Sequence, residues 1–124
     1  QRFRRTHGDK FSVLVIDSLG ALYSLMSESA EMRKKMFYFF KMLRDNNLVT
    51  FIIMERSLTG ESQLLGNEGF LADGIIMLGL DRPRGKLVRY LQVEKMRAAE
   101  HSMEKHAIEV GKSGMTVLGP LLST

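Results

Sequence analysis

Two kinds of residue in this sequence could do chemistry, and the first is a carboxylate at the end of an apolar run. Residues 13–16 are Val-Leu-Val-Ile, and Asp17 and Ser18 follow them directly. In this pattern, known as Walker B, buried apolar residues hold a carboxylate at a strand tip. There it can bind Mg²⁺, usually through water, beside nucleotide phosphates. The pattern is short, so an aspartate that only ends a strand or caps the next segment stays open as the alternative.

The second kind is a pair of cations, Lys95 and Arg97, near the end of a predicted strand. Residues two apart on a strand project from the same face, so both side chains would point together. Two converging cations suit a polyanion, and an arginine can stabilise the charge that develops during phosphoryl transfer. The alternative is a solvated strand end.

A phosphate-binding loop of the form G-x-x-x-x-G-K-[ST] is absent from residues 1–124. The segment Gly111-Lys112-Ser113 resembles its end, but the residue five before Gly111 is His106 instead of glycine. The hydrophobic pattern around it favours a hairpin turn. His101 and His106 have no further ligands in a metal-binding pattern, which favours surface histidines.

The elements that must position these residues follow from two continuous apolar runs, residues 11–16 and 48–54. Such runs are typical of strands buried on both faces of a parallel sheet. Between them, apolar residues recur at helical spacing and predict a helix over 29–45, with Ser29 as N-cap and a stop at Asn46-Asn47. Strand, helix and strand in this order favour a βαβ unit with parallel strands. Asp17 and Glu55 would then emerge at the same carboxyl edge, where open α/β sheets bind ligands.

The rest of the chain predicts shorter strands and turns. A third buried strand is expected over 74–80, a hairpin continues into a strand over 86–96, and a final hairpin joins 106–110 to 115–118. The predicted fold class is therefore α/β, with a mostly parallel central sheet, a flanking helix and C-terminal antiparallel hairpins.

The composition sets outer limits. The chain has 124 residues, no cysteine, and 18 Lys and Arg against 14 Asp and Glu. No run of 18 or more uncharged apolar residues is present, so a soluble, cytoplasmic protein without a membrane span is expected. The basic excess permits nucleic-acid binding without requiring it, and residues 1–10 are expected to form a basic N-terminal arm.

The order of these motifs is more specific than any one of them. Val13 to Leu19, Glu55-Arg56, the run 68–76 containing Ala72-Asp73-Gly74, and Lys95-Met96-Arg97 followed by His101 occur in turn. Over residues 11–118 the sequence resembles the C-terminal half of a KaiC-like ATPase domain of the RecA superfamily. The resemblance implies a single partial RecA-like domain over 1–124 that lacks the N-terminal Walker A portion.

The resemblance also implies roles for individual residues. Asp17 would act on Mg²⁺ through water, with Ser18 beside it, and Glu55 would be a sensor or structural residue near the nucleotide. Lys95 and Arg97 would reach across a subunit interface toward the ATP of a neighbouring protomer, which requires a homo-oligomeric ring or filament. The family usually has Gly-Thr after the arginine, whereas this chain has Ala98-Ala99.

The leading hypothesis is a portion of a KaiC-like ATPase that binds ATP and Mg²⁺ between protomers and does not hydrolyse ATP alone. One alternative is a non-catalytic regulatory or assembly module that uses the RecA-like surface for contacts with other proteins. The other is a nucleic-acid-binding protein.

Overall fold

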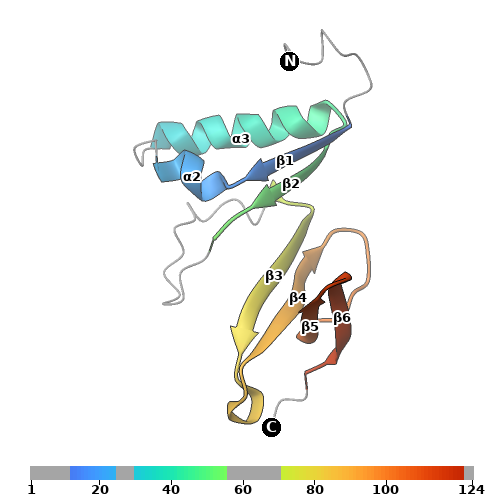
Figure 1. Cartoon of the computed structure of the whole chain (residues 1–124). Helices are drawn as coiled ribbons and strands as arrows, with labels where there is room; N and C mark the ends of the chain where they lie inside the picture. The colour runs from blue at the N-terminus through green and yellow to red at the C-terminus, as the bar shows by residue number, and fades with distance from the viewer. Residues whose placement is uncertain (1–11, 25–29, 56–70, 122–124) are drawn as a thin grey trace. The chain divides into compact units, whose positions relative to one another are not determined.

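A computed structural model of the chain describes residues 12–24, 30–55 and 71–121, which fall in two compact units, residues 1–71 and 72–124. The first holds β1 (Val13–Asp17), α2 (Leu19–Ser24), α3 (Ala30–Asp45) and β2 (Val49–Ile53) (Figure 1). The second holds β3 (Gly74–Asp81), the 3-10 turn η2 (Pro83–Gly85), β4 (Val88–Met96), β5 (His106–Gly111) and β6 (Gly114–Pro120). Ser29 and residues 1–10, predicted to be an N-cap and a basic arm, lie outside the described residues.

The two strands of the first unit, β1 and β2, are parallel, as the βαβ prediction requires. Their register pairs Val13 with Val49 at one end and Asp17 with Ile53 at the other. The helix α3 lies between them in the sequence and runs alongside the pair in the structure (Figure 1). Both strands therefore end at the same edge, where the residues that follow them meet.

The helix α3 forms because its apolar residues share one face. Met32, Met36 and Leu43 are buried at positions that lie one above another along a helix. The other faces carry exposed aromatic residues, Phe37 and Tyr38, and exposed charges. Among the charges are Lys35 and Glu31, one turn apart, with 3.6 Å between Nζ and Oε1.

The end of α3 is a Schellman motif, in which two backbone bonds close the last turn. The N–H of Asn47 donates to the carbonyl of Arg44 at 3.0 Å, and the N–H of Leu48 donates to the carbonyl of Leu43 at 3.4 Å. Asn47 has a φ of 52°, the left-handed conformation that this motif needs and that asparagine tolerates better than most residues. The predicted stop at Asn46-Asn47 is therefore confirmed.

One face of the β1–β2 pair is exposed. The face carries Val13, Val15, Val49, Phe51 and Ile53, each between 45% and 59% exposed. The alternate residues of both strands are half-buried. The prediction of burial on both faces is wrong for the described chain. An apolar run shows that a strand can be buried on both faces, but it does not show that another element packs on each face.

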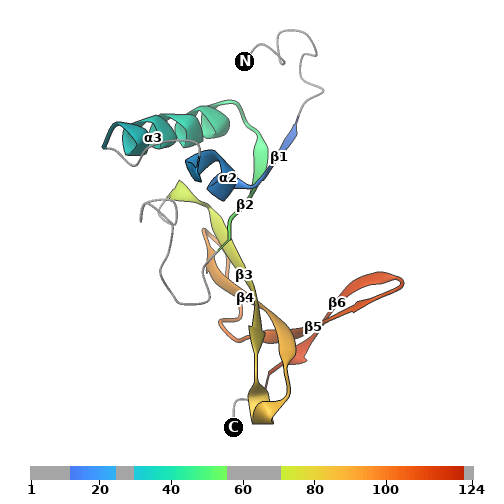
Figure 2. The same ribbon diagram turned by 60° about the vertical axis from the view of Figure 1, so that its left-hand side comes forward.

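The second unit is a four-stranded antiparallel sheet with the order β3-β4-β5-β6 (Figures 1 and 2). The prediction of a mostly parallel sheet thus holds for β1 and β2 alone among the described strands. The physical reason lies in the connections of the second unit, which are residues 82–87, 97–105 and 112–113. Parallel neighbours need a crossover of a dozen residues or more, and these links are shorter.

A glycine allows a close contact between β3 and β4. Gly79 lies opposite Tyr90, and a Cβ at this position would come within 2.7 Å of the tyrosine Cζ. The tyrosine ring therefore covers the strand backbone where a side chain would otherwise stand. No helix in the described part of the chain is long and apolar enough to cross a membrane.

Candidate functional site

The carboxyl edge of β1 and β2 carries the first candidate residues. Asp17 is the last residue of β1 and lies beside Ile53, and Glu55 comes two residues after Ile53. Both carboxylates are exposed. Their common edge follows directly from the parallel register.

Ser18 has a local structural contact at this edge. Its Oγ accepts a hydrogen bond from the N–H of Ala21 at 3.4 Å, so the hydroxyl caps the start of α2. The peptide bond between Asp17 and Ser18 is cis. Leu19, the next residue, is fully buried and anchors this end of β1 in the unit.

The donor set at this edge fits a magnesium ion that takes most of its ligands from water and phosphate. Among the residues that the structure describes, no three His, Asp or Glu side chains gather closely enough to hold a metal ion on their own. Mg²⁺ prefers carboxylate oxygen, keeps several waters and is commonly bound by one or two carboxylates together with substrate phosphates. Asp17 offers such a carboxylate in an exposed position.

Lys95 lies on β4 beside a β-bulge. Ile75 pairs with Lys95 whereas Ile76 pairs with Val93, so Glu94 is an extra residue on β4. A bulge re-aims the side chains next to it and interrupts the simple alternation of faces. Lys95 is half-buried in this position.

Arg97 lies beyond the end of β4, which stops at Met96. Strand alternation alone therefore does not fix the direction of Arg97, and the expectation that Lys95 and Arg97 share a face stays a prediction. Two contacts with Asp73 fix Arg97 instead. Its backbone N–H donates to the Asp73 carbonyl at 2.8 Å, and its Nη1 lies 2.8 Å from the Asp73 Oδ1.

Asp73 also belongs to this site, but the sequence alone assigned no role to it. It belongs to the run Ala72-Asp73-Gly74, which contributes to the family resemblance but was given no function. The length of the β3–β4 hairpin alone would place Asp73 opposite Met96, and the bulge at Glu94 brings it to Arg97 instead.

Comparison with known proteins shows the family and the fold of the chain. The sequence pattern of the family described as "ATPase: KaiC" matches residues 5–121. The chain belongs to the KaiC family of ATPases. The crystal structure of the KaiC-like protein PH0186 from Pyrococcus horikoshii matches the chain with a TM-score of 0.77 and 30% identity, over 95% of this chain and 53% of that one. The α/β fold is thus similar to that of a KaiC-like, RecA-type protein.

Two curated relatives extend the comparison. A UPF0273 protein of Aeropyrum pernix is 31% identical over 106 residues, which are 84% of this chain and 41% of that protein. The circadian clock protein KaiC3 of Synechocystis is 28% identical over 111 residues, which are 88% of this chain and 22% of that protein. The chain therefore spans less than half the length of both curated relatives.

The turn after Arg97 contains an alanine with a positive φ. Ala98 has a φ of 59°, in the left-handed region that glycine adopts without cost. The alanine therefore adopts a backbone conformation that glycine favours, and its Cβ makes that conformation strained. The turn that follows the arginine thus keeps the conformation that a glycine favours.

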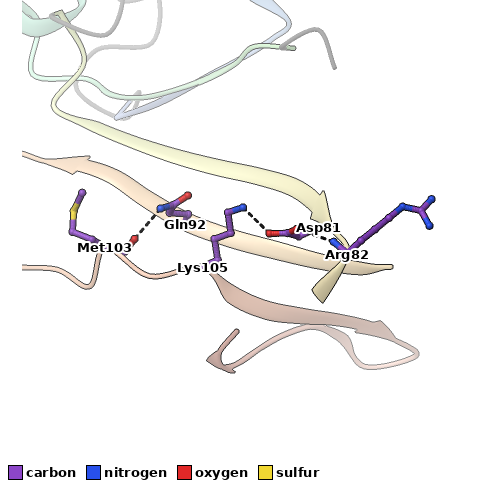
Figure 3. Close-up of polar contacts among 5 residues, drawn as sticks. All are labelled: Asp81, Arg82, Gln92, Met103 and Lys105. Carbon is purple, nitrogen blue, oxygen red and sulfur yellow. Dashed lines mark hydrogen bonds and ion pairs between the residues drawn. The ribbon is translucent and has the colours of Figure 1, made fainter. Parts of the chain in front are cut away.

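The connection that begins at Arg97 is anchored to the sheet at its other end. The Nζ of Lys105 lies 2.6 Å from the Asp81 Oδ2, and the Nε2 of Gln92 donates to the Met103 carbonyl at 2.8 Å (Figure 3). The backbone N–H of Arg82 donates to the other Asp81 oxygen at 2.7 Å. Both ends of this KaiC-family loop therefore have defined partners.

The ion pair at this anchor changes the proton affinity of both groups. The hydrogen bond from Lys105, with the Arg82 N–H as a second donor, lowers the pKa of Asp81 below its ordinary value of 3.8. The hydrogen bond to Asp81 raises the pKa of Lys105 above 10.5. The ammonium also lies 4.5 Å from the centre of the Tyr90 ring.

The remaining candidates have structural contacts. Lys112 and Ser113 form the turn between β5 and β6, as predicted. The ring nitrogens of His106 lie 3.3 Å from the Leu118 carbonyl and 3.2 Å from the Ser102 Oγ. The Nδ1 of His101 lies 3.0 Å from the Ser102 carbonyl. These contacts tie the C-terminal strands and the loop before them together.

Proposed function

We propose that this chain contributes a Walker B strand and a Lys-x-Arg finger to a Mg-ATP site formed between subunits of a KaiC-type ATPase. The observation that supports this most directly is the parallel pairing of β1 and β2, because it presents Asp17 at the carboxyl edge of the sheet. Ligands bind at that edge in open α/β sheets. Membership of the KaiC family of ATPases is the reason for proposing ATP as the ligand.

The role of Asp17 in this proposal is to orient water bound to Mg²⁺ at the nucleotide phosphates. The ion, when bound, neutralises charge on the β- and γ-phosphates. Ser18 caps the start of α2 and keeps the backbone after Asp17 in place. Glu55, at the neighbouring strand end, would act as a sensor of the nucleotide or as a structural residue beside it.

The role of Lys95 and Arg97 is to bring positive charge to the ATP of a neighbouring subunit. An arginine that contacts the transferring phosphoryl group accelerates phosphoryl transfer by about 10³- to 10⁵-fold in enzymes that use one. Delivery from a neighbour requires a homo-oligomer in which one surface meets a different surface of the next subunit, as in a ring or filament.

The proposal predicts that residues 1–124 alone do not turn over ATP, because they contain no phosphate-binding loop. An active assembly is made by joining a RecA-type segment with a G-x-x-x-x-G-K-[ST] loop ahead of Gln1. In that assembly Asp17→Ala should abolish Mg-dependent turnover, while Glu31→Gln, a change on the exposed surface of α3, should leave it unaltered. Turnover by residues 1–124 alone that Asp17→Ala removes would contradict the proposal.

A mixing experiment tests delivery from the neighbour. Subunits with Asp17→Ala and subunits with Arg97→Ala should each be inactive when they assemble alone. After mixing at equal amounts, about a quarter of the interfaces pair an intact Asp17 with an intact Arg97, and turnover should return in that proportion. If Arg97 acted within its own subunit, the mixture would stay as inactive as its components.

A further inference from the structure

Arg97 lacks the support that a regular element gives to a side chain. It follows the last residue of β4 and precedes Ala98, whose φ of 59° turns the chain away from the strand. A strand would set the direction of the side chain through its pleat, and a turn does not. A long arginine in a turn therefore needs a partner if its guanidinium is to have a defined position.

Asp73 supplies two contacts of different kinds. The Asp73 carbonyl accepts the backbone N–H of Arg97 at 2.8 Å and so extends the β3–β4 ladder by one bond. The Asp73 carboxylate lies 2.8 Å from Nη1 and so orients the side chain. The first contact survives any side-chain change at position 73, whereas the second depends on the carboxylate.

The same strand end brings together two sequence motifs. Gly74, after Asp73, pairs with Met96, and a Cβ on Gly74 would lie 3.3 Å from the methionine sulfur. Two residues of Ala72-Asp73-Gly74 thus meet two residues of Lys95-Met96-Arg97, with Gly74 making room for Met96 and Asp73 binding Arg97. The pairing gives a physical reason for both motifs in one chain.

The ion pair stays open to an approaching ligand. The side chain of Arg97 is 47% exposed and that of Asp73 is 71% exposed. A guanidinium carries five N–H donors in a planar fork, so it can bind a carboxylate on one side and a phosphate on another. The contact with Asp73 is therefore compatible with delivery of the arginine to a phosphate.

We propose that Asp73 is a positioning residue that fixes the aim of Arg97 before ATP arrives. This inference rests on the proposed function, because it assigns Asp73 a role through the arginine finger. Fixing the side chain in advance removes rotamer freedom that would otherwise be lost in the transition state. Asp73 thereby acts on the rate of the chemical step without contacting the nucleotide.

The kinetic test uses the phosphate-loop assembly that contains the full chain. Asp73→Asn keeps the size of the side chain and removes its charge. We expect kcat to fall about two- to fivefold, the effect of losing one exposed ion pair, while KM changes less than twofold. Asp73→Glu restores a carboxylate and should recover part of the loss. The matched control is Glu31→Gln, which removes an exposed ion pair on α3, distant in sequence from Asp73 and Arg97.

A second measurement tests the contact itself in the full 124-residue chain. The Nε–Hε resonance of Arg97, observed by NMR, should shift and sharpen in Asp73→Asn because the guanidinium becomes more mobile, and Glu31→Gln should leave it in place. The unfolding temperature of Asp73→Asn should stay within about 2 °C of the original, since exposed ion pairs add little stability. A purely structural role for Asp73 would lower that temperature and leave kcat of the folded variant unchanged.

The outcomes separate this inference from the proposed function. If Arg97→Ala abolishes turnover while Asp73→Asn leaves kcat unchanged, the positioning role is wrong and the finger stands. If Arg97→Ala leaves turnover unchanged, the finger is wrong, and the positioning role is overturned with it. An Arg97 resonance that does not respond to Asp73→Asn overturns the positioning role whatever the kinetics show.

Discussion

Replacing Ala98 by glycine should stabilise the second unit. A left-handed conformation costs an L-residue with a Cβ about 1–2 kcal/mol, and Ala98 has a φ of 59°. Glycine also makes the unfolded chain more flexible, which costs about 0.4–1 kcal/mol. The difference leaves a net gain of about 1 kcal/mol in the free energy of unfolding. Because Ala98 is exposed, the lost methyl group forfeits little burial.

Ala99→Gly is the matched control, since Ala99 is also exposed but does not have a positive φ. It carries the same cost in the unfolded chain without the relief, so it should destabilise by about 0.4–1 kcal/mol. The two variants should therefore differ by about 1–2 kcal/mol, which isolates the cost of the left-handed alanine.

The assay is a urea titration that follows the NMR resonances of β3 and β4. With an m-value of about 1.5 kcal/mol/M, a gain of about 1 kcal/mol should raise the midpoint of Ala98→Gly by roughly 0.7 M, and the midpoint of Ala99→Gly should fall. Equal shifts in the same direction would refute the reasoning, because they would show that the backbone at position 98 is not strained.

Three further predictions concern positions described above. Gly79→Ala should destabilise the second unit by about 1–3 kcal/mol, measured by the same titration, because a Cβ would lie 2.7 Å from the Tyr90 ring. Asn47→Ala should destabilise the first unit by about 1 kcal/mol and Asn47→Gly should not, as circular dichroism of thermal unfolding can show, because φ at this position is 52°. The depressed pKa of Asp81 makes its pair with Lys105 contribute stability above pH 3.8 and lose it as the pH falls further. The raised pKa of Lys105 keeps that contribution below pH 10.5 and loses it above, and the Lys105 side-chain resonances near the Tyr90 ring should follow both transitions.

The elements that sequence reasoning located well are those that depend on local patterns. Helical spacing of buried residues gave α3, and two asparagines marked its end because a Schellman motif needs a residue that tolerates a positive φ. The order of strand, helix and strand gave the parallel pairing that brings Asp17 and Glu55 to one edge. The final hairpin was visible from its glycine-rich turn.

The parts that could not be read from the sequence depend on contacts between distant residues. Asp73 and Arg97 are 24 positions apart, and the register of β3 against β4 decides that they meet. The bulge at Glu94 leaves no local mark, yet it changes how Lys95 is presented. The antiparallel sheet of the second unit was missed in part because an apolar run has the same appearance in either sheet type.

The exposed apolar face of β1 and β2 has a practical consequence for the behaviour of the chain in solution. Its valines, phenylalanine and isoleucine lie next to one another across the two strands, so they form a continuous water-facing patch and not scattered contacts. Salts such as ammonium sulfate strengthen association through such patches. A purified sample should therefore increase the fluorescence of the dye ANS. It should precipitate at a low concentration of ammonium sulfate and be more soluble at low ionic strength.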